Sequence, residues 1–366
     1  MKKVKFEIDH MDPMGQGVSR EGKTVTFIAG TLPGETGSAV VYKKSKGVQF
    51  ATLHTLEKSA DSRCKPACVH FEECPGCHYL HTDYASELNY KQSALLRHLA
   101  YLELPDDVFE LVPAPRRLAY RNRIQLHYRH KYIGMLDPVN NKVVEIPHCQ
   151  IFQGELQESF NKLYEDKSWA TEITGHGHCE LYLKDGKVSQ RWNGEYAHGG
   201  FSQVYAEMNL QLQSRVQALL TSMSAGSVAD LFSGRGNLSN DFVQLGGQRV
   251  LVDSAWDGEP DTAPKNFLPL DLYAEDSLRR FVRAFGKKNF DTLLVEPPRR
   301  GFPQLDSWAK KIKPQNLLYV SCNPASLARD LRGLTSKYRV SAVQLLVLFP
   351  ATYHFETLVA LRFRGI

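Results

Sequence analysis

The sequence lacks several features that would place the chain in a specialised class of protein. No apolar run approaches the ~20 residues that a membrane-spanning helix needs, and residues 1–10 carry no apolar stretch of the kind found in secretory signal peptides. The net charge of +5 is too small to indicate a polyanionic partner by itself. These absences predict a cytoplasmic protein without membrane attachment, and no obligate protein partner is evident.

A complete dinucleotide-binding fingerprint is also missing. Such a fingerprint needs three glycines after a strand. Gly234 and Gly236 follow an apolar stretch at 227–232, but Ser239 stands where the third glycine would lie. NAD binding is therefore disfavoured. The chain has 366 residues, of which 42% are hydrophobic, and this composition predicts a globular protein of two or three domains.

Seven cysteines are present, although structural disulfides are rare in the cytoplasm. Four of them crowd together as Cys64, Cys68, Cys74 and Cys77, with a Pro-Gly turn between the last two. This spacing indicates metal binding through thiolates, by zinc or by an iron–sulfur cluster. No histidine follows at zinc-finger spacing, and the C-x3-C-x2-C triplet of radical enzymes does not occur.

Three stretches near the C-terminus combine an apolar strand with a reactive or acidic side chain. Cys322 follows the strand 317–321, Glu296 ends the strand 290–295 before two prolines, and Glu356 follows Phe-Pro-x-x-x-His-x. Open α/β sheets bind ligands at the carboxyl ends of their strands. A lone cysteine in a strand is most often a small core residue, but the two carboxylates favour a catalytic cysteine here.

These motifs resemble the C-terminal signature of the RNA uracil-5 methyltransferases, and the resemblance covers nearly the whole chain. They are Glu-Pro-Pro-Arg-Arg-Gly at 296–301, Val-Ser-Cys-Asn-Pro-Ala-Ser-Leu-Ala-Arg-Asp at 320–330 and Phe-Pro-x-x-x-His-x-Glu at 349–356. Asp-Leu-Phe-x-Gly-x-Gly-Asn at 230–237 resembles the first motif of S-adenosylmethionine methyltransferases. The resemblance implies that Cys322 attacks carbon 6 of uracil and that Glu356 removes the proton from carbon 5. The implied cofactor-binding residues are Gln203, Phe232, Asn237, Asp253, Asp271 and Glu296.

The cysteines extend this resemblance. Family members that hold a [4Fe–4S] cluster use C-x5-C-x2-C with a distant fourth cysteine, which implies the ligands Cys68, Cys74, Cys77 and Cys149. A zinc site that uses Cys64 in place of Cys149 is the alternative. Cys179 is expected to be structural.

Two regions are predicted to bind RNA. Residues 1–58 contain short strands between glycine-rich turns, which predicts a small β-barrel. Gly-x-Gly-Val at 15–18 and Leu-Pro-Gly-Glu at 32–35 resemble the OB-like TRAM domain, with a generic barrel as the alternative. The stretch 116–132 has six Lys or Arg and three Tyr without a carboxylate. We expect RNA contacts there, with Arg121 and Arg123 among them; a solvated strand face is the alternative.

The predicted organisation therefore has three parts. They are a TRAM barrel over 1–58, a central β-rich iron–sulfur and RNA-binding domain over 59–80 and 112–198, and an α/β Rossmann-like class I methyltransferase domain over 81–111 and 199–366. Helices are expected over 84–99 and about 206–222 from their apolar spacing. The barrel and the cysteines resemble the branch of the family that acts on 23S ribosomal RNA.

Several positions depart from the family pattern. They are Ser202, Tyr205, Ser233, Asp253 and Glu296, the last two being an Asp for a ribose-binding Glu and a Glu for the Asp before Pro-Pro. Residues 254–266 also form a loop by composition where the family has a helix. Three alternatives therefore stay open: a catalytically degenerate RNA-binding paralogue, a tRNA uracil-5 methyltransferase, and an RNA cytosine-5 methyltransferase.

Overall fold

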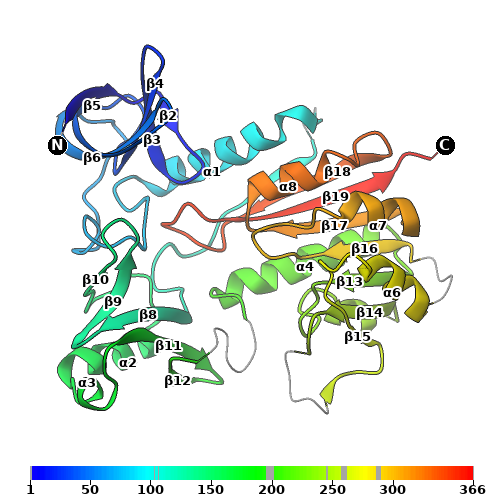
Figure 1. Cartoon of the computed structure of the whole chain (residues 1–366). Coiled ribbons are helices and arrows are strands. Elements are labelled where there is room, and N and C mark those ends of the chain that lie inside the picture. The colour runs from blue at the N-terminus through cyan, green and yellow to red at the C-terminus, as the bar shows by residue number, and fades with distance from the viewer. Residues whose placement is uncertain are drawn as a thin grey trace. The chain divides into compact units, whose positions relative to one another are not determined.

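The computed structural model describes residues 2–102, 104–105, 107–194, 202–244, 246–256, 262–285 and 290–365. The chain divides into two compact units (Figure 1). Unit 1 consists of Met1–Ala94, Pro115–Tyr196 and Phe349–Tyr353, and unit 2 consists of Leu95–Ala114, Ala197–Leu348 and His354–Ile366. The division falls within helix α1 (Tyr84–Leu99), which we had assigned as a whole to the methyltransferase domain. The three-part division stays a prediction.

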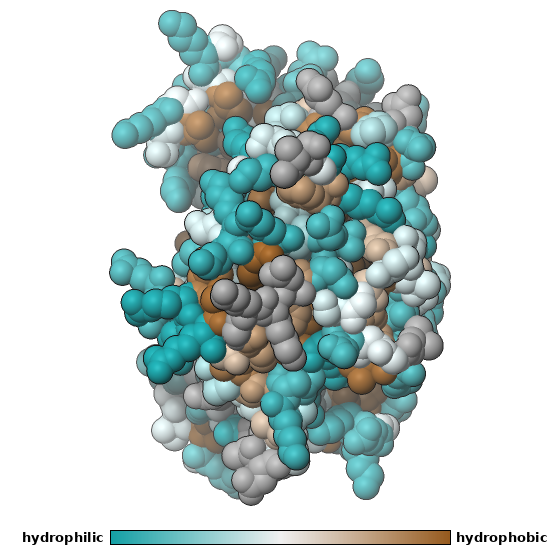
Figure 2. Space-filling model, turned by 90° about the vertical axis from the view of Figure 1, so that its right-hand side faces the viewer, coloured by the Kyte–Doolittle hydropathy of each residue, from teal (hydrophilic) through white to brown (hydrophobic). Residues whose placement is uncertain are grey.

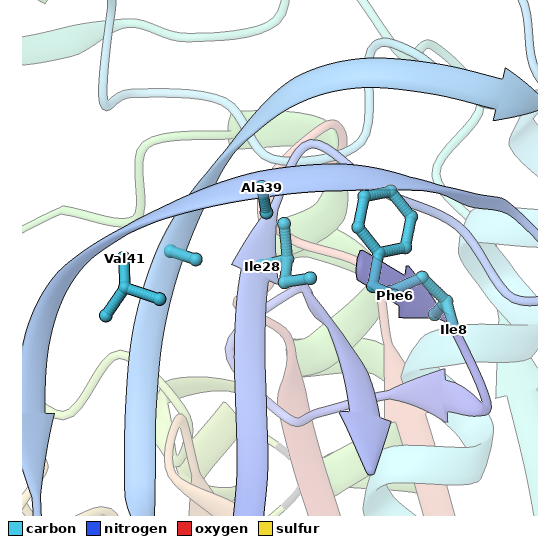
Figure 3. Close-up of a cluster of buried hydrophobic side chains, with 6 residues drawn as sticks. Phe6, Ile8, Ile28, Ala39 and Val41 are labelled. Carbon is cyan, nitrogen blue, oxygen red and sulfur yellow. The ribbon is translucent and has the colours of Figure 1, made fainter. Parts of the chain in front are cut away.

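The first sheet of unit 1 curls around its own apolar core (Figure 3). Its strands are β1 (Lys3–Glu7), β2 (His10–Met11), β3 (Gln16–Glu21), β4 (Thr24–Ala29), β5 (Thr36–Ser45) and β6 (Val48–Lys58), in the order β1-β5-β6-β4-β3-β2. The core residues are Phe6, Ile8, Ile28, Ala39, Val41 and Ala51. Gly17, in the Gly-x-Gly-Val motif, sits where a Cβ would lie 2.2 Å from Thr31 Oγ1, so only glycine fits.

The second sheet of unit 1 is antiparallel throughout. Its strands are β8 (Arg123–Arg129), β9 (Tyr132–Asp137), β10 (Lys142–Val144), β11 (His176–Lys184) and β12 (Lys187–Trp192), in the order β10-β9-β8-β11-β12. Helices α2 (Gly154–Glu165) and α3 (Trp169–Glu172) lie between β10 and β11 in the chain. Alternate residues of β8 are buried, as a sheet with one covered face requires. Cys179 is fully buried in β11, which agrees with the structural role expected for it.

Unit 2 is built on an eight-stranded mixed sheet in the order β15-β14-β13-β16-β17-β19-β18-β7. The strands are β7 (Phe109–Val112), β13 (Ser227–Leu231), β14 (Gln248–Asp253), β15 (Phe267–Pro269), β16 (Thr292–Val295), β17 (Asn316–Ser321), β18 (Tyr338–Leu346) and β19 (Glu356–Phe363). Strands β13 to β17 pair in parallel, and β19 runs antiparallel between β17 and β18. The chain order reverses between β13 and β16, and open α/β sheets bind ligands at such a reversal.

The helices of unit 2 connect these strands. They are the 3-10 helix η1 (Ala100–Leu102), α4 (Ala206–Ser222), α5 (Asn240–Gln244), α6 (Ser277–Phe285), α7 (Leu305–Ile312) and α8 (Pro324–Leu331). Helices α1 and α4 match the two predicted helices. After Asp253, the described residues 254–256 and 262–266 contain no α-helix, in agreement with the predicted loop; residues 257–261 lie outside the described residues.

None of the described helices combines the length and the apolar composition that a membrane span requires. The face of the molecule in Figure 2 is covered mostly by hydrophilic side chains, with smaller hydrophobic patches between them.

Candidate active site and cysteine group

The pairing of β17 with β19 brings Cys322 and Glu356 to the same edge of the sheet. Strand β17 ends at Ser321, and Cys322 follows it directly. Strand β19 begins at Glu356 and runs antiparallel to β17, with Ser321 opposite Thr357. The start of one antiparallel strand lies beside the end of the other. The two residues that the sequence singled out therefore meet, although 33 positions separate them along the chain.

Asn323 holds the turn that carries Cys322. Its side chain caps helix α8 by accepting a hydrogen bond from the Ala325 amide at 3.0 Å, and Pro324 occupies the first turn. The side-chain nitrogen of Asn323, Nδ2, also donates to the carbonyl oxygen of Arg299 at 2.9 Å. This hydrogen bond connects the Ser-Cys-Asn-Pro motif to the Glu-Pro-Pro-Arg motif.

The electrostatics around Cys322 oppose loss of its proton. Burial, and then the neighbouring Glu356 carboxylate, raise the pKa of Cys322 to about 12. Burial also raises the pKa of Glu356 well above its ordinary value, and the Glu296 carboxylate adds to this effect. Arg299 acts in the opposite direction, because its guanidinium lowers the pKa of both groups. Burial therefore opposes ionisation of both groups, and Arg299 is the cation that favours it.

Two of the predicted cofactor-binding residues contact each other. The Gln203 Nε2 donates to Glu296 Oε1 at 3.4 Å. Burial raises the pKa of Glu296 to about 8, with a further contribution from the buried Asp230.

The first glycine motif and the acid at the end of β14 are also joined. Asp253 Oδ2 accepts a hydrogen bond from the Gly234 amide at 2.8 Å, and Asp253 Oδ1 accepts one from the Ser254 amide at 2.6 Å. Phe232 has a left-handed backbone with φ 62°, a conformation that costs about 1–3 kcal/mol and gathers at functional sites. Its ring packs 5.3 Å from that of Tyr273, measured between centroids.

Asn237 and Asp271 lie in different surroundings. The Asn237 amide exchanges hydrogen bonds with Asn209 of α4 and accepts one from Gln213 Nε2 at 2.8 Å. Asp271 is exposed, and its Oδ1 accepts from the Tyr273 amide at 2.9 Å. Asp271 is thus linked to Phe232 through Tyr273, whereas Asn237 is held against helix α4.

Sequence reasoning missed one buried network beside this site. Ser239, at the position of the absent third glycine, donates to Asp230 Oδ2 and accepts from Arg249 Nη1 at 2.9 Å. Burial raises the pKa of Asp230 to about 7. A serine in place of the glycine was visible in the sequence, but its partner Arg249 belongs to the next strand. Ser239, which stands in place of the third glycine of the dinucleotide pattern, therefore gives the buried Asp230 a hydrogen-bond donor.

The structure places the predicted cysteine ligands within electrostatic range of each other. Burial raises the pKa of Cys77 well above its ordinary value, and Cys149, Cys74 and Cys68 each add to this effect. The Gly76 amide donates to Cys74 Sγ at 3.4 Å, the kind of contact that stabilises a thiolate. Cys64 is exposed, and its thiol donates to the Leu80 carbonyl oxygen at 3.6 Å. We call Cys68, Cys74, Cys77 and Cys149 the cysteine group.

The cysteine group has the chemistry of a metal site without its geometry. Within the part of the chain that the structure describes, no three or more His, Cys, Asp or Glu side chains are arranged to hold a metal ion. Burial and the neighbouring thiols raise the pKa of Cys74, Cys77 and Cys149, and such a donor set nevertheless fits a thiolate-bound metal, because coordination removes the protons. The neighbouring Arg121 lowers the pKa of Cys77 and Cys149 and so favours the same change.

The basic stretch is less available to RNA than its composition suggested. Arg123 is 3% exposed, lies 3.4 Å from the Glu180 carboxylate and covers the Tyr182 ring at 4.8 Å. Tyr120 and Tyr128 are buried. This placement favours a packing role for Arg123 over the predicted phosphate contact. Arg121 is half-buried, and Arg129, Lys131 and Tyr132 are exposed.

The segment Phe349–Tyr353, which precedes Glu356 in the chain, is hydrogen-bonded to other residues of unit 1. Ala351, at φ 64°, donates its amide to Glu87 Oε1 at 2.8 Å, and its carbonyl oxygen accepts from the His78 and Tyr79 amides at 2.7 and 3.0 Å. Lys91 Nζ donates to the Phe349 carbonyl oxygen at 3.0 Å and to Glu87. Glu87 and Lys91, both on α1, are fully buried. The segment Phe349–Tyr353 thus packs with residues from the first quarter of the chain.

Comparisons with known proteins show what the chain is similar to. Residues 274–364 match the family model described as tRNA (uracil-5-)-methyltransferase. A 23S rRNA (uracil(1939)-C(5))-methyltransferase RlmD of Marinomonas posidonica is 27% identical over 420 aligned residues, which cover 98% of this chain and 94% of that protein. A relative of the same name from Shewanella frigidimarina is 26% identical and covers 98% of this chain and 95% of its own length.

A solved structure shows the same fold over the full length. The tRNA (uracil-54, C5)-methyltransferase of Pyrococcus abyssi, in complex with S-adenosyl-L-homocysteine, matches with a TM-score of 0.70 and 21% identity. The match covers 98% of this chain and 100% of that one. The resemblance to the RNA uracil-5 methyltransferases is confirmed by these comparisons, and with it the prediction of an enzyme of that class.

Proposed function

We propose that the protein transfers a methyl group from S-adenosylmethionine to carbon 5 of a uridine in 23S ribosomal RNA. The observation that carries this proposal is the pairing of Ser321 with Thr357, which brings Cys322 and Glu356 to one edge of the sheet. The near-full-length relatives named as 23S rRNA uracil-C5 methyltransferases support ribosomal RNA as the substrate.

The two side chains supply what this chemistry needs. Carbon 5 of uracil is a poor nucleophile, so the Cys322 thiolate first adds to carbon 6, and the electron pair moves onto the ring as an enolate. Carbon 5 of the enolate then takes the methyl group, whose bond to the sulfonium sulfur of S-adenosylmethionine would break, with the electron pair left on that sulfur as a neutral thioether. The Glu356 carboxylate removes the carbon-5 proton, and the Cys322–carbon 6 bond breaks to restore the double bond and the free thiolate.

Residues that follow or end β13, β14, β15 and β16, together with one residue before α4, would hold the cofactor. We assign this role to Gln203, Phe232, Asn237, Asp253, Asp271 and Glu296. S-adenosylmethionine would supply an activated methyl group on a sulfonium. Because the target base must reach Cys322 from a folded RNA, the uridine would leave its stack.

The cysteine group would hold a [4Fe–4S] cluster, with zinc as the runner-up. Its mutual pKa shifts and the neighbouring Arg121 support this assignment. The bound group would tie the loop that contains Cys68, Cys74 and Cys77 to Cys149. We also propose that the curled sheet of residues 1–58 is a TRAM domain, and that Arg121 contacts RNA.

A second candidate, a non-catalytic RNA-binding paralogue, is favoured by one observation. Asp253 is shorter than the glutamate of the family, and no α-helix follows it in residues 254–256 and 262–266. If these departures abolish cofactor binding, the chain would bind RNA without modifying it.

RNA that contains 5-fluorouracil separates the two candidates. With S-adenosylmethionine present, Cys322 adds and carbon 5 is methylated, but fluorine cannot leave as a proton. A covalent protein–RNA complex should therefore persist on a denaturing gel, should require the cofactor, and should be absent from Cys322→Ala. The absence of the complex at any cofactor concentration, with RNA still bound, would establish the binding protein instead. Parallel reactions with 23S and tRNA fragments identify the RNA class.

A further inference from the structure

Three aromatic rings form a row on the outer face of the six-stranded sheet. Successive side chains of a regular strand point to opposite faces. Ile28 and Val41 point into the core (Figure 3), and Ala51 belongs to the same core. The residues before Ile28 and Ala51 are aromatic and face outward, and the aromatic residue after Val41, which lies at an irregularity in the pairing of β5 with β6, is exposed. We call these three residues the aromatic row: Phe27 of β4, Phe50 of β6 and Tyr42 of β5.

The rings of the aromatic row lie next to each other. Phe27 and Phe50 are direct partners in the parallel pairing of β4 with β6, and their ring centroids are 5.4 Å apart with 21° between the planes. Tyr42 is 6.5 Å from Phe50 with 40° between the planes. Tyr42 is 42% exposed, and the two phenylalanines are partly exposed. Three adjacent strands therefore present one aromatic surface to the outside of the sheet.

The surroundings of the aromatic row are basic. Residues 36–56, which form most of β5 and β6, contain three lysines and no carboxylate. Lys43 is paired with Phe50 across the strands, and its Nζ lies 5.7 Å from the centre of that ring. Lys43, Lys44 and Lys46 are all exposed. Asp137 is the acid that acts on Tyr42, and together with burial it raises the pKa of the phenol.

Rings and lysines in this arrangement match one ligand. The sheet already has its core, so the outward rings are not needed to fill it. Aromatic surfaces bind unpaired bases by stacking, which contributes about 1–3 kcal/mol per base, and nearby lysines neutralise the phosphates between those bases. Bases in a duplex are already stacked on each other and cannot use such a surface.

We propose that the aromatic row is a stacking platform for two or three unpaired bases of the RNA substrate. The proposal rests on the proposed function in one respect only, namely that the ligand is RNA. It adds a site outside the methyltransferase unit and predicts that the substrate is single-stranded where it crosses β4, β5 and β6.

The test measures binding of the full-length protein to a fluorescent uridine oligomer of about ten nucleotides, within the range that such platforms cover. Tyr42→Leu and Phe50→Leu should each weaken the Kd by about 5- to 100-fold. Tyr42→Phe keeps the ring and is the matched control, and its Kd should equal that of the native protein. Lys43→Gln should lower the salt dependence of binding.

The outcomes are distinct. An unchanged Kd in Tyr42→Leu, with native circular dichroism, would overturn the proposal, as would an equal loss of affinity for a blunt RNA duplex. Methyl transfer separates this proposal from the proposed function. In the ring variants the RNA concentration for half-maximal rate should rise, while the rate at saturating RNA stays native. Failure of the 5-fluorouracil complex together with ring-dependent RNA binding would reject the methyltransferase and keep the platform.

Discussion

The cysteine group and Cys322 are two environments that act on the same chemical group in different ways. In the cysteine group, thiols are neighbours of thiols, and burial with repulsion from these neighbours raises the pKa of Cys74, Cys77 and Cys149. At Cys322 a single thiol is the neighbour of carboxylates and of Arg299. Both environments disfavour a free thiolate in the isolated protein.

The two environments differ in the event that would let their thiols lose a proton. A metal removes the protons of several thiols at once, because each coordinated sulfur is bound as a thiolate. A lone thiol beside a carboxylate is relieved by attack on an electrophile, since the sulfur then carries no charge. The crowded thiols thus fit the proposed permanent bond to a metal, and the thiol beside an acid fits the proposed transient bond to a substrate.

The largest expected effect follows from removing the lone thiol. Cys322→Ala should lower methyl transfer at least about 10³-fold, because no other group can add to carbon 6. Radiolabelled methyl incorporation into RNA measures this rate. Cys64→Ala is the matched control and should keep native activity, since Cys64 is exposed and lies outside both sites. If Cys322→Ala kept more than about one hundredth of the native rate of methyl transfer, Cys322 and the cysteine group would not be distinct in function.

The next effect concerns the crowded thiols. Cys149→Ser should abolish the broad absorption at about 400 nm that iron–thiolate bonds produce in anaerobically purified protein, and should lower its iron content. Cys64→Ser should leave both unchanged. Stoichiometric zinc without iron would replace the cluster by zinc, and loss of metal in Cys64→Ser but not in Cys149→Ser would identify the alternative ligand set.

A smaller effect tests the cation beside Cys322. Arg299→Gln removes a charge that lowers the pKa of Cys322 and Glu356, so both pKa values should rise. Less thiolate and less carboxylate are then present at any given pH, and the pH–rate profile should move to higher pH by about one unit, which is about tenfold at pH 7. Arg299→Lys should keep most of the native profile. A uniform loss of rate without a pH shift would assign Arg299 to RNA binding.

The smallest effect is on stability. Burial raises the pKa of Glu296 from 4.5 to about 8, so the folded protein holds a proton that the unfolded chain releases. The stability from this group is fully present below pH 4.5 and is lost as the pH rises through about 8. In Glu296→Gln, the urea midpoint should therefore fall less between pH 5 and pH 8 than in the native protein. The exposed Glu275→Gln should retain the native slope.

Much of unit 2 could be predicted because its strands are short apolar runs that end in motifs. The strands before Glu296 and Cys322 and the helix α4 lie where the sequence placed them, as does α1, most of which belongs to unit 1. No local sequence pattern predicts that Cys322 and Glu356 lie side by side. Strand β19 enters the sheet antiparallel, beside β17 rather than at the end of a parallel series.

The basic stretch shows why the remainder could not be predicted. Within residues 116–132 there is no carboxylate, but Arg117 pairs with Glu87 at 2.9 Å and Arg123 with Glu180 at 3.4 Å. A sequence window does not show acids that the fold brings in from elsewhere. The alternation of β8 also buries Tyr128 while its neighbour Arg129 stays exposed. Two of the residues that read as RNA contacts in the sequence are partners of internal acids in the fold.

The fastening of Phe349–Tyr353 within unit 1 has a consequence for how the protein is made. A ribosome releases a chain from its N-terminus, and most domains fold in that order. Unit 1 cannot follow this order, because Glu87 and Lys91 bond to backbone groups of Ala351 and Phe349. Until almost the last of the 366 residues has emerged, Glu87 and Lys91 keep their bond to each other but lack these backbone partners. Unit 1, most of which comes from the first half of the chain, is therefore complete only after residues 349–353 have been synthesised. A nascent chain stalled before residue 349 lacks this part of unit 1.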